Sequence, residues 1–308
     1  MRSLSSATSI GGAPQARLQL KDFSRLLALT VLVSGAPAVA ARAPSWERPY
    51  RPVKIEEAHV RLGHARDTAL DPESLKVLVW NIKKAELPLW RKEFLELGHG
   101  KDLLLLQETY GSDLFLSTLG LFGSHRWDMG VSFLYTRINN TPTGSMIGSA
   151  VSPSTVLVQH SPDLEPFVFT PKAITFASYP VRGSRAELLA VSVHGINFTD
   201  AGAFERQMLR AKKVIEGHQG PVVFAGDFNT WSGQRTRFLR TLTKDLGLGE
   251  VEFPNGGRRM TGPFSGLFLD HAFIRGLRVK RAEVVEASLG SDHKPLDLEL
   301  EVLGPELE

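Results

Sequence analysis

The sequence predicts an α/β (α+β) fold in which two β-sheets pack face to face and helices cover their outer faces. From Leu75 onward, short apolar segments of strand length alternate with a few segments of helical periodicity. The strand candidates far outnumber the helix candidates, which favours two packed sheets over a single sheet. The chain of 308 residues is 42% hydrophobic, so it can bury a sizeable core.

The strand candidates share runs of aliphatic and aromatic residues bounded by glycine, proline or polar residues. In chain order they are 75–80, 102–107, 131–135, 146–150, 155–159, 172–178, 187–193, 222–225, 269–274, 279–285 and 296–301. Loops rich in proline and glycine are expected at 139–144, 159–171 and 253–266.

Four helices are expected, at 86–97, 112–119, 200–216 and 233–245. The pattern is clearest in 200–216, where Phe204, Met208 and Ile215 share one face and Gly217 supplies a stop. A stripe of this kind indicates packing against the core and not a cofactor site.

Residues 1–40 have the parts of a secretory signal peptide. Basic residues including Arg25 precede the apolar run 26–33, and the small-residue site Ala38-Val39-Ala40 follows. The run is too short to span a bilayer. We therefore expect cleaved export to the periplasm or the medium, with an uncleaved or disordered tail as the alternative.

Residues 41–72 are expected to form an extended N-terminal arm, because they are rich in proline, arginine and glutamate without sustained periodicity. His59 and His64 lie in this arm, and a solvated linker is favoured over a metal-binding pair. Residues 73–308 are expected to form one domain.

The charge balance excludes a polycationic protein. The formal net charge is +3, but residues 1–40 carry four basic residues against one acidic residue, so the rest of the chain is neutral. Any nucleic acid would therefore bind at a local site and not through a global basic field. The chain has no cysteine, which rules out disulfides and thiolate ligands.

Polar side chains stand at the boundary of an apolar strand at six places. A single residue of this kind would be an ordinary cap or turn residue. In Gly226-Asp227-Phe228-Asn229, Asp227 and Asn229 are two apart and would point the same way from a strand end. An Asx turn is the alternative for these four residues. The positions are Asn81, Glu108, His194, Asp227 with Asn229, Asp270, and Asp292 with His293. Together they predict one cluster at the rim of the two sheets.

The residue types indicate metal-assisted chemistry. Asn81, Glu108 and Asp292 offer hard oxygen ligands, which favour Mg²⁺, with Mn²⁺ or Ca²⁺ as alternatives, over structural zinc. Two histidines with separate carboxylates would supply acid–base catalysis or charge stabilisation. No serine or cysteine nucleophile motif and no phosphate-binding Gly-x-x-x-x-Gly-Lys loop is present. This inventory fits attack of water on a phosphate ester.

In their order along the chain, these motifs resemble the endonuclease/exonuclease/phosphatase superfamily, which includes DNase I and neutral sphingomyelinases. The resemblance extends from about Leu75 to Leu300 and implies a four-layered α/β sandwich of two mixed sheets flanked by helices. It rests on Trp80-Asn81, Gln107-Glu108, His194, Gly226-Asp227-Phe228-Asn229, Leu269-Asp270-His271 and Ser291-Asp292-His293-Lys294-Pro295. More closely, Val79-Trp80-Asn81-Ile82, Asn197-Phe198 and Asn229-Thr230-Trp231-Ser232 resemble a bacterial branch of it.

The resemblance implies a role for each matching residue. Glu108 would be the principal metal ligand, with Asn81 and Asp292 around the same ion or the scissile phosphate. Asp227 would position the attacking water, and Asn229 would bind the phosphate.

The two histidines have separate implied roles. His293, oriented by Asp270, would be a general base or a phosphate stabiliser. His194 is the residue that DNase I-like and sphingomyelinase-like members have at this position, which makes abasic-site repair a poor fit. Lys83 stands where some repair members have a further acid, so one metal ion is favoured over two.

Substrate specificity is expected in the loops over the site. The candidates are Trp231, Arg182, Arg185 and Arg235, together with Arg258 and Arg259. Trp231 would either stack on a base or pack beneath the adjacent helix. His271 would point away from Asp270 in a strand, so a structural role is expected for it.

These observations lead to a metal-dependent phosphodiesterase, with DNA or RNA as the first expected substrate and a monomeric chain. The alternative substrates are membrane lipids, as in a sphingomyelinase or phospholipase C, and inositol or sugar phosphates. The apolar segment 264–268 keeps the lipid alternative open. A non-catalytic binding module on the same fold is the alternative from another class.

Overall fold

The computed structural model describes residues 49–166, 168–255, 262 and 265–304. The predicted signal peptide, the first part of the predicted arm, Arg258, Arg259 and Phe264 lie outside the described residues. Within the described part, no helix is both long and apolar enough to cross a membrane.

Two mixed sheets form the centre of the fold. The eight-stranded sheet has the order β1-β5-β6-β4-β3-β14-β13, with β2 also pairing with β5. The six-stranded sheet has the order β11-β12-β10-β9-β8-β7. The bounds in the first sheet are β1 Tyr50–Pro52, β2 His59–Gly63, β3 Leu75–Asn81, β4 Leu103–Tyr110, β5 Arg126–Tyr135, β6 Thr141–Ser149, β13 Leu277–Val284 and β14 Leu296–Val302. Those in the second are β7 Thr155–His160, β8 Ala173–Tyr179, β9 Leu188–His194, β10 Val222–Asp227, β11 Gly249–Glu250 and β12 Asp270–Arg275.

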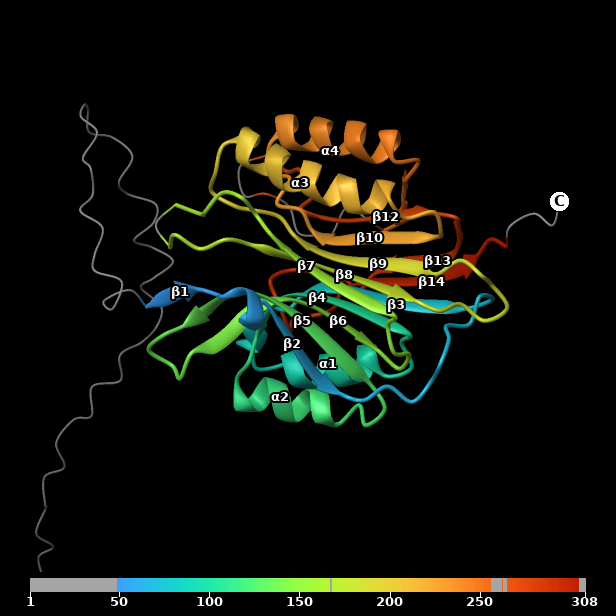
Figure 1. The fold of residues 1–308 in the computed structure, drawn as a ribbon, viewed down its shortest axis with the longest axis horizontal. Helices are drawn as coiled ribbons and strands as arrows, with labels where there is room; N and C mark the ends of the chain where they lie inside the picture. Colours follow the sequence, from blue (N-terminus) through green and yellow to red (C-terminus); the bar gives the residue numbers. More distant parts are fainter. Residues whose placement is uncertain (1–48, 167, 256–261, 263–264, 305–308) are drawn as a thin grey trace, which may run out of the picture. The chain divides into compact units, whose positions relative to one another are not determined.

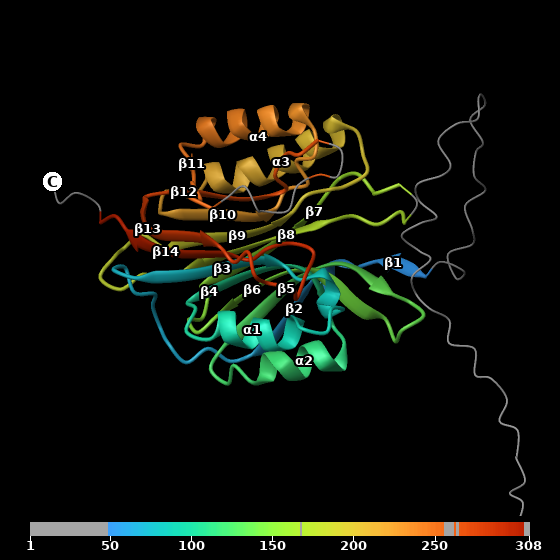
Figure 2. The ribbon, with the colours of Figure 1, turned by 180° about the vertical axis from the view of Figure 1, so that it is seen from behind.

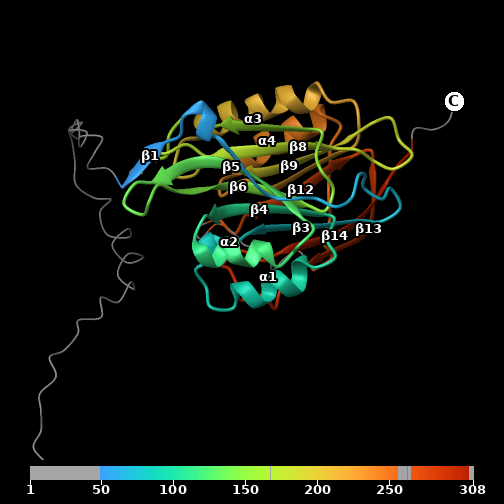
Figure 3. The same cartoon turned by 60° about the horizontal axis from the view of Figure 1, so that its bottom comes forward.

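Helices cover the outer face of each sheet, so the fold has the four layers that the resemblance implied (Figure 1). α3 (Ala201–Glu216) and α4 (Gly233–Asp245) lie on the six-stranded sheet. α1 (Trp90–Gly98) and α2 (Asp113–Gly120) lie on the eight-stranded sheet, and the view from behind shows the same layers (Figure 2). Figure 3 shows α1 and α2 near β3 and β4 of that sheet. Short 3₁₀ turns occupy Ile55–Glu57 and Lys83–Ala85.

Alternating side chains along the central strands explain their continuous apolar sequences. In β3, Val77 and Val79 pack between the two sheets, whereas Leu78 and Trp80 pack beneath α1 and α2. In β10, Val223 and Ala225 likewise face the other sheet, while Val222 and Phe224 face α3 and α4. Both faces of these strands are therefore covered by protein, as in buried parallel sheets.

Strand direction brings the polar strand ends together. β3 and β4 are parallel, with Asn81 beside Gln107, so Asn81 and Glu108 come to one edge. β9 and β10 are also parallel, and β12 is antiparallel to β10, so His194, Asp227 and Asp270 lie side by side across three strands. The segment before β14 extends past the end of β3, because β14 runs antiparallel to it. This delivers His293 to the same edge.

The structure differs from the expected elements mainly at the N-terminal arm and at the edges. Residues 50–52 and 59–63, predicted within an arm, pair with β5. His59 is not a metal ligand there, because its Nε2 lies 2.8 Å from Asp128 Oδ1. Residues 141–144, predicted as a loop, belong to β6, since Pro142 and Gly144 are accommodated opposite β5 near a β-bulge.

Candidate active site

The strand-end cluster comprises Asn81, Glu108, His194, Asp227, Asp270 and His293, and the structure places these six residues together. The Asn81 amide Nδ2 donates to Asp227 Oδ2 at 3.0 Å and to Glu108 Oε1 at 3.3 Å. His194 Nε2 lies 4.0 Å from Glu108 Oε1 and 3.9 Å from Asp227 Oδ2. The Asn81 amide and the His194 imidazole thus lie between the same two carboxylates.

His293 and Asp270 form a buried pair beside Asp227. The Nδ1 atom of His293 lies 3.0 and 2.9 Å from the two Asp270 oxygens, and its Nε2 lies 3.8 Å from Asp227 Oδ2. The Trp80 indole donates to the His293 carbonyl at 3.0 Å, and the hydroxyl of Ser291 donates to the Asn81 carbonyl at 2.7 Å. These bonds tie the loop that carries His293 to β3.

Backbone geometry at one strand end and at one β-bulge orients the two carboxylates. Gly226, just before Asp227, has φ +143°, and a Cβ there would lie 2.2 Å from the Val193 carbonyl oxygen. Only glycine therefore allows β10 to approach β9 this closely. Glu108 has φ +52° and lies between Leu106 and Thr109, where the β4 register shifts. β4 continues to Tyr110, so Glu108 lies at a bulge and not at the end of the strand.

Asp227 and Asn229 meet through a turn and not through strand alternation, because β10 ends at Asp227. The Asn229 backbone N–H donates to Asp227 Oδ1 at 2.9 Å, and its side-chain amide donates to the Gly195 carbonyl at 3.0 Å. Asn229 has φ +51°, a conformation that asparagine tolerates. The Asx turn and the functional arrangement therefore coexist, and Asn229 fixes the Asp227 carboxylate.

Burial and neighbouring charges shift the protonation of the cluster. Burial raises the pKa of Asp227 to about 7, against the opposing effect of His293. Burial favours neutral His293, but Asp270 and Asp227 outweigh it and raise the pKa of His293 to about 10. An imidazolium at His293 is suited to stabilising a phosphate and not to removing a proton from water.

The other two titrating groups shift downward. Burial, followed by the charge of Lys172, holds the pKa of His194 well below its usual range. Burial would raise the pKa of Glu108, but the ammonium groups of Lys172 and Lys84 contribute to lowering it to about 2. Glu108 is therefore ionised at neutral pH, as a cation ligand must be.

Asp292 forms an ion pair with Lys83. Its Oδ2 atom lies 2.9 Å from Lys83 Nζ, and its side chain is 45% exposed. Among the described residues, Asp227, Asp270 and His293 are the group of three acidic or histidine side chains whose ligand atoms all lie within 4.8 Å of one another. The hydrogen bonds from His293 to Asp270 account for part of that closeness.

A left-handed turn follows Asn81 and directs two lysines to the cluster. Lys83, Lys84 and Ala85 have φ of 46°, 55° and 59° in succession. Each such residue costs about 1–2 kcal/mol relative to a right-handed conformation. The turn places Lys84 Nζ 3.7 Å from Glu108 Oε2 while Lys83 holds Asp292. Backbone strain of this kind concentrates at functional sites.

The basic residues predicted to grip a substrate lie elsewhere. Arg182 and Arg185 follow β8, next to the start of β9, whereas His194 is at the end of β9. Six residues of strand separate the two ends, about 20 Å. Arg182 pairs with Asp71 at 3.4 Å. The order of the strands therefore keeps both arginines away from the cluster, contrary to the prediction.

Arg235 is structural, contrary to the prediction. Its side chain is fully buried and donates to the carbonyls of Ile196, Asn229 and Thr199 at 2.7, 3.2 and 2.8 Å. Its guanidinium also lies 4.6 Å from the Trp231 ring centroid. The Trp231 indole donates to Asn197 Oδ1 at 2.9 Å, so packing describes Trp231 better than an open stacking platform.

His271 has the structural role that was expected. Its Nδ1 lies 2.8 Å from Glu250 Oε1, and its Nε2 lies 2.9 Å from the hydroxyl of Thr230. These partners lie outside the strand-end cluster.

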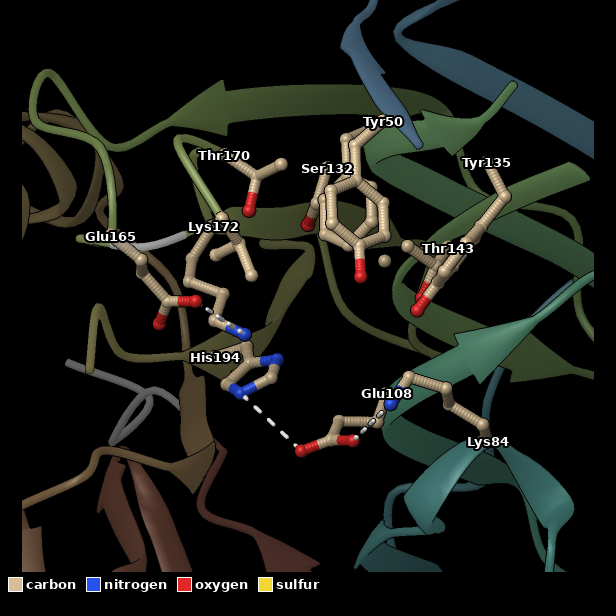
Figure 4. Close-up of a pocket in the computed structure, with 13 residues that line it drawn as sticks. Tyr50, Lys84, Glu108, Ser132, Tyr135, Thr143, Glu165, Thr170, Lys172 and His194 are labelled. Carbon is tan, nitrogen blue, oxygen red and sulfur yellow. Dashed lines mark ion pairs between the residues drawn. The ribbon is translucent and has the colours of Figure 1, made fainter. Parts of the chain in front are cut away.

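Sequence reasoning missed a cavity of about 200 Å³ that opens beside Glu108 and His194 (Figure 4). Its walls include Tyr50 from β1, Lys172 just before β8, and Glu165 and Thr170 from the preceding loop. One signal could have revealed Lys172. β8 is antiparallel to β9, so a residue preceding β8 must lie near His194 at the end of β9.

The fold and the cluster define a class, the four-layered α/β sandwich with a carboxylate–histidine centre where its two sheets meet. The chain belongs to the Endonuclease/Exonuclease/phosphatase family, whose sequence profile matches residues 78–293. It therefore has the phosphoesterase fold of that superfamily, as the motifs predicted.

The chain is also similar in sequence to bacterial proteins and in fold to solved structures. A UPF0294 protein of Vibrio cholerae is 34% identical over 235 residues, covering 76% of this chain and 80% of the relative. One from Yersinia pestis is 33% identical over 241 residues, covering 78% and 87%. The fold is similar to that of an endonuclease/exonuclease/phosphatase from Beutenbergia cavernae, with a TM-score of 0.60 and 17% identity over 75% of this chain and 72% of that one. It is also similar to the human Nocturnin catalytic domain with bound sulfate, with a TM-score of 0.55 and 16% identity over 82% and 99%.

Proposed function

We propose that this protein is a divalent-metal-dependent phosphodiesterase that hydrolyses phosphate esters by attack of an activated water. The observation that carries the proposal is the convergence of Glu108, Asp227 and His293 at the shared end of the two sheets. Two carboxylates face one amide there, and a charged histidine lies beside them. This arrangement supplies cation binding, orientation of a water and stabilisation of negative charge.

The side chains at the cluster fit a hard divalent cation. Glu108 is an ionised carboxylate with 27% exposure, and the Asn81 amide lies against it. Asp292 would join them if Lys83 released it. Bound there, Mg²⁺, or Mn²⁺ or Ca²⁺ in its place, would polarise a phosphoryl oxygen as a Lewis acid.

The protein's own groups have separate parts in the reaction. Asp227, held by Asn81 and Asn229, accepts a proton from the attacking water or orients it. His293, held by Asp270, donates from Nε2 toward the phosphate and stabilises its growing charge. His194, neutral at pH 7, hydrogen-bonds a phosphate oxygen or a nearby water.

Nucleic acid is the first substrate to test, as the sequence indicated. The zebrafish TDP2 structure, similar in fold with a TM-score of 0.53 and 15% identity, is a complex with a single-stranded DNA product. The cavity beside Glu108 favours a second candidate, a phosphate ester with a small polar alcohol group.

The test is a panel of substrates with Mg²⁺ or with a chelator. Plasmid DNA, single-stranded DNA, RNA, bis-p-nitrophenyl phosphate, sphingomyelin and inositol phosphates would each be incubated with purified protein. We expect turnover of at least bis-p-nitrophenyl phosphate, and we expect the chelator to abolish it. Absence of metal-dependent turnover on every substrate would favour a binding module on this fold.

Lys84 should weaken cation binding, because its ammonium lies 3.7 Å from the Glu108 carboxylate. We expect Lys84→Met to tighten Mn²⁺ binding about fivefold in titration calorimetry, since a like charge at short range costs about 1 kcal/mol in water. Lys92→Met is the matched control, because Lys92 is 72% exposed and pairs with Glu96 on α1. Equal affinities in wild type and Lys84→Met would place the ion away from Glu108.

Export remains a further proposal, because residues 1–40 lie outside the described part of the chain. We propose that the signal peptide is removed near Ala40. N-terminal sequencing of the protein recovered from cell-envelope and medium fractions checks it. An intact N-terminus on cytoplasmic protein would contradict export.

A further inference from the structure

We propose that the Thr170 cavity, the space bounded by Tyr50, Glu108, Thr170, Lys172 and His194, binds the alcohol part of the substrate, and that this part is a compact polyhydroxylated group. The inference rests on the proposed function and names the substrate class of the same site. Glyceryl, inositol and sugar phosphate esters belong to this class.

The cavity adjoins the reacting centre directly. Glu108 and His194 belong both to the strand-end cluster and to the cavity wall (Figure 4). A phosphate held at Glu108 and His194 would therefore place its ester group inside this space. The cavity therefore lies where an alcohol group esterified to that phosphate would have to bind.

An unpaired hydroxyl in the cavity wall supports a polar ligand. Thr170 is 1% exposed, and its Oγ1 has no hydrogen-bond partner. Leaving such a group unpaired costs about 1–3 kcal/mol, so buried hydroxyls are usually bonded. Figure 4 shows the Thr170 hydroxyl and the Tyr50 hydroxyl directed toward the same space. A ligand hydroxyl in the cavity would satisfy Thr170.

The remaining lining matches a neutral, hydroxyl-rich group. Hydroxyl-bearing side chains donate and accept equally well, as sugar and polyol hydroxyls do. Five of them line the cavity, from Tyr50, Ser132, Tyr135, Thr143 and Thr170. The two ammonium groups are each matched by a carboxylate, Lys172 with Glu165 at 3.3 Å and Lys84 with Glu108 at 3.7 Å.

The same features disfavour a choline group. A quaternary ammonium is recognised by an open aromatic cage or by excess negative charge. Here two lysine ammonium groups line the wall. The rings of Tyr50, Phe133 and Tyr135 pack edge to face on one another, with centroids 5.3 and 5.1 Å apart around Tyr50. The sphingomyelinase alternative is therefore weaker than a polyol phosphate ester.

A nucleoside is also a poor fit. The cavity of about 200 Å³ is smaller than the roughly 300–1,000 Å³ of pockets for drug-sized ligands. Base recognition needs a free aromatic face, which the mutually packed rings of this wall do not offer.

Binding of product-like phosphates tests the inference independently of turnover. Titration calorimetry with Mg²⁺ present would use glycerol 3-phosphate, inositol 1-phosphate, phosphocholine and thymidine monophosphate. We expect glycerol 3-phosphate or inositol 1-phosphate to bind at least tenfold more tightly than phosphocholine and thymidine monophosphate. We expect Thr170→Val to weaken that binding about fivefold, the worth of one hydrogen bond. Equal affinity for all four phosphates would overturn the inference.

Two controls separate a binding role from a structural one. Thr170→Val replaces an unpaired buried hydroxyl by a methyl, so its unfolding midpoint should equal or exceed that of wild type. Thr155→Val makes the same change on an exposed strand residue, at the end of β7 that pairs with Ser178, and should leave binding unchanged. Unaltered polyol-phosphate binding by Thr170→Val would overturn the inference.

Turnover measurements distinguish a membrane lipid from a soluble ester as the source of the polyhydroxylated group. Phosphatidylglycerol or phosphatidylinositol in vesicles, and soluble glycerophosphodiesters, would each be compared with bis-p-nitrophenyl phosphate. Thr170→Val should raise KM for the polyol ester about fivefold, whereas the control Thr155→Val should leave KM for the polyol ester and turnover of bis-p-nitrophenyl phosphate unchanged. Preference for either source supports the inference. If the protein hydrolysed bis-p-nitrophenyl phosphate and DNA but neither the lipid nor the soluble polyol esters, the inference would be overturned. The proposed phosphodiesterase activity would still hold.

Discussion

Replacing Asp227 by asparagine is expected to lower metal-dependent turnover about a thousandfold, within the range of about 10²–10⁴ for loss of an acid–base group. The Asp227 carboxylate is 2% exposed and lies between the Asn81 amide and the His293 imidazole. Asparagine keeps the shape and one acceptor oxygen, but it cannot take a proton from water. The measurement is kcat for bis-p-nitrophenyl phosphate with saturating Mg²⁺.

The Asp227→Asn experiment needs a control for folding and one for the chemical change. Circular dichroism and the unfolding midpoint should remain close to those of wild type. Asp245→Asn makes the same substitution near the end of α4, where Asp245 is 54% exposed and pairs with Lys212. It should leave kcat unchanged. A value of kcat for Asp227→Asn within threefold of wild type would remove Asp227 from the mechanism.

Replacing Arg235 by methionine is expected to lower the free energy of unfolding by about 3–5 kcal/mol. The fully buried guanidinium satisfies three carbonyls from two separate loops, Ile196 and Thr199 after β9 and Asn229 after β10. Methionine fills much of the volume but leaves those carbonyls unpaired. Because Asn229 fixes Asp227, turnover should fall as well.

Urea unfolding of Arg235→Met measures the effect. Arg237→Met changes an exposed arginine on the same helix and should stay within about 0.5 kcal/mol of wild type. A loss below about 1 kcal/mol in Arg235→Met would mean that the buried bonds contribute little and that Arg235 is free for another role.

Elements covered on both faces were predictable from sequence, because burial on both sides demands an uninterrupted apolar run. β3, β9 and β10 are of this kind. Strands at the edge of a sheet were not predictable from sequence, since their pairing depends on a partner strand far along the chain. β1 and β2 pair with β5, which begins more than sixty residues after the end of β2. Each of the two strands is too short for its alternation of side chains to be recognised in the sequence.

The strand-end cluster could be predicted because each residue follows or begins an apolar run, and strand direction then brings the ends together. The residues around the substrate could not be predicted in this way. Arg182 and Arg185 were chosen for their charge alone, and the order of the strands puts them near the other end of β9. Thr170 and Lys172 reach the site from a loop whose path no local pattern specifies, and Arg235 gave no sign of burial.

The account depends most on one cation held at Glu108. Titration calorimetry with Mn²⁺ on wild type and Glu108→Gln measures this directly, because glutamine keeps the size of the side chain and removes its charge. We predict one ion per wild-type chain and at least a tenfold loss of affinity in Glu108→Gln, with an unchanged unfolding midpoint in the absence of metal. Saturable binding of equal strength in both proteins, or no binding to either, would contradict it.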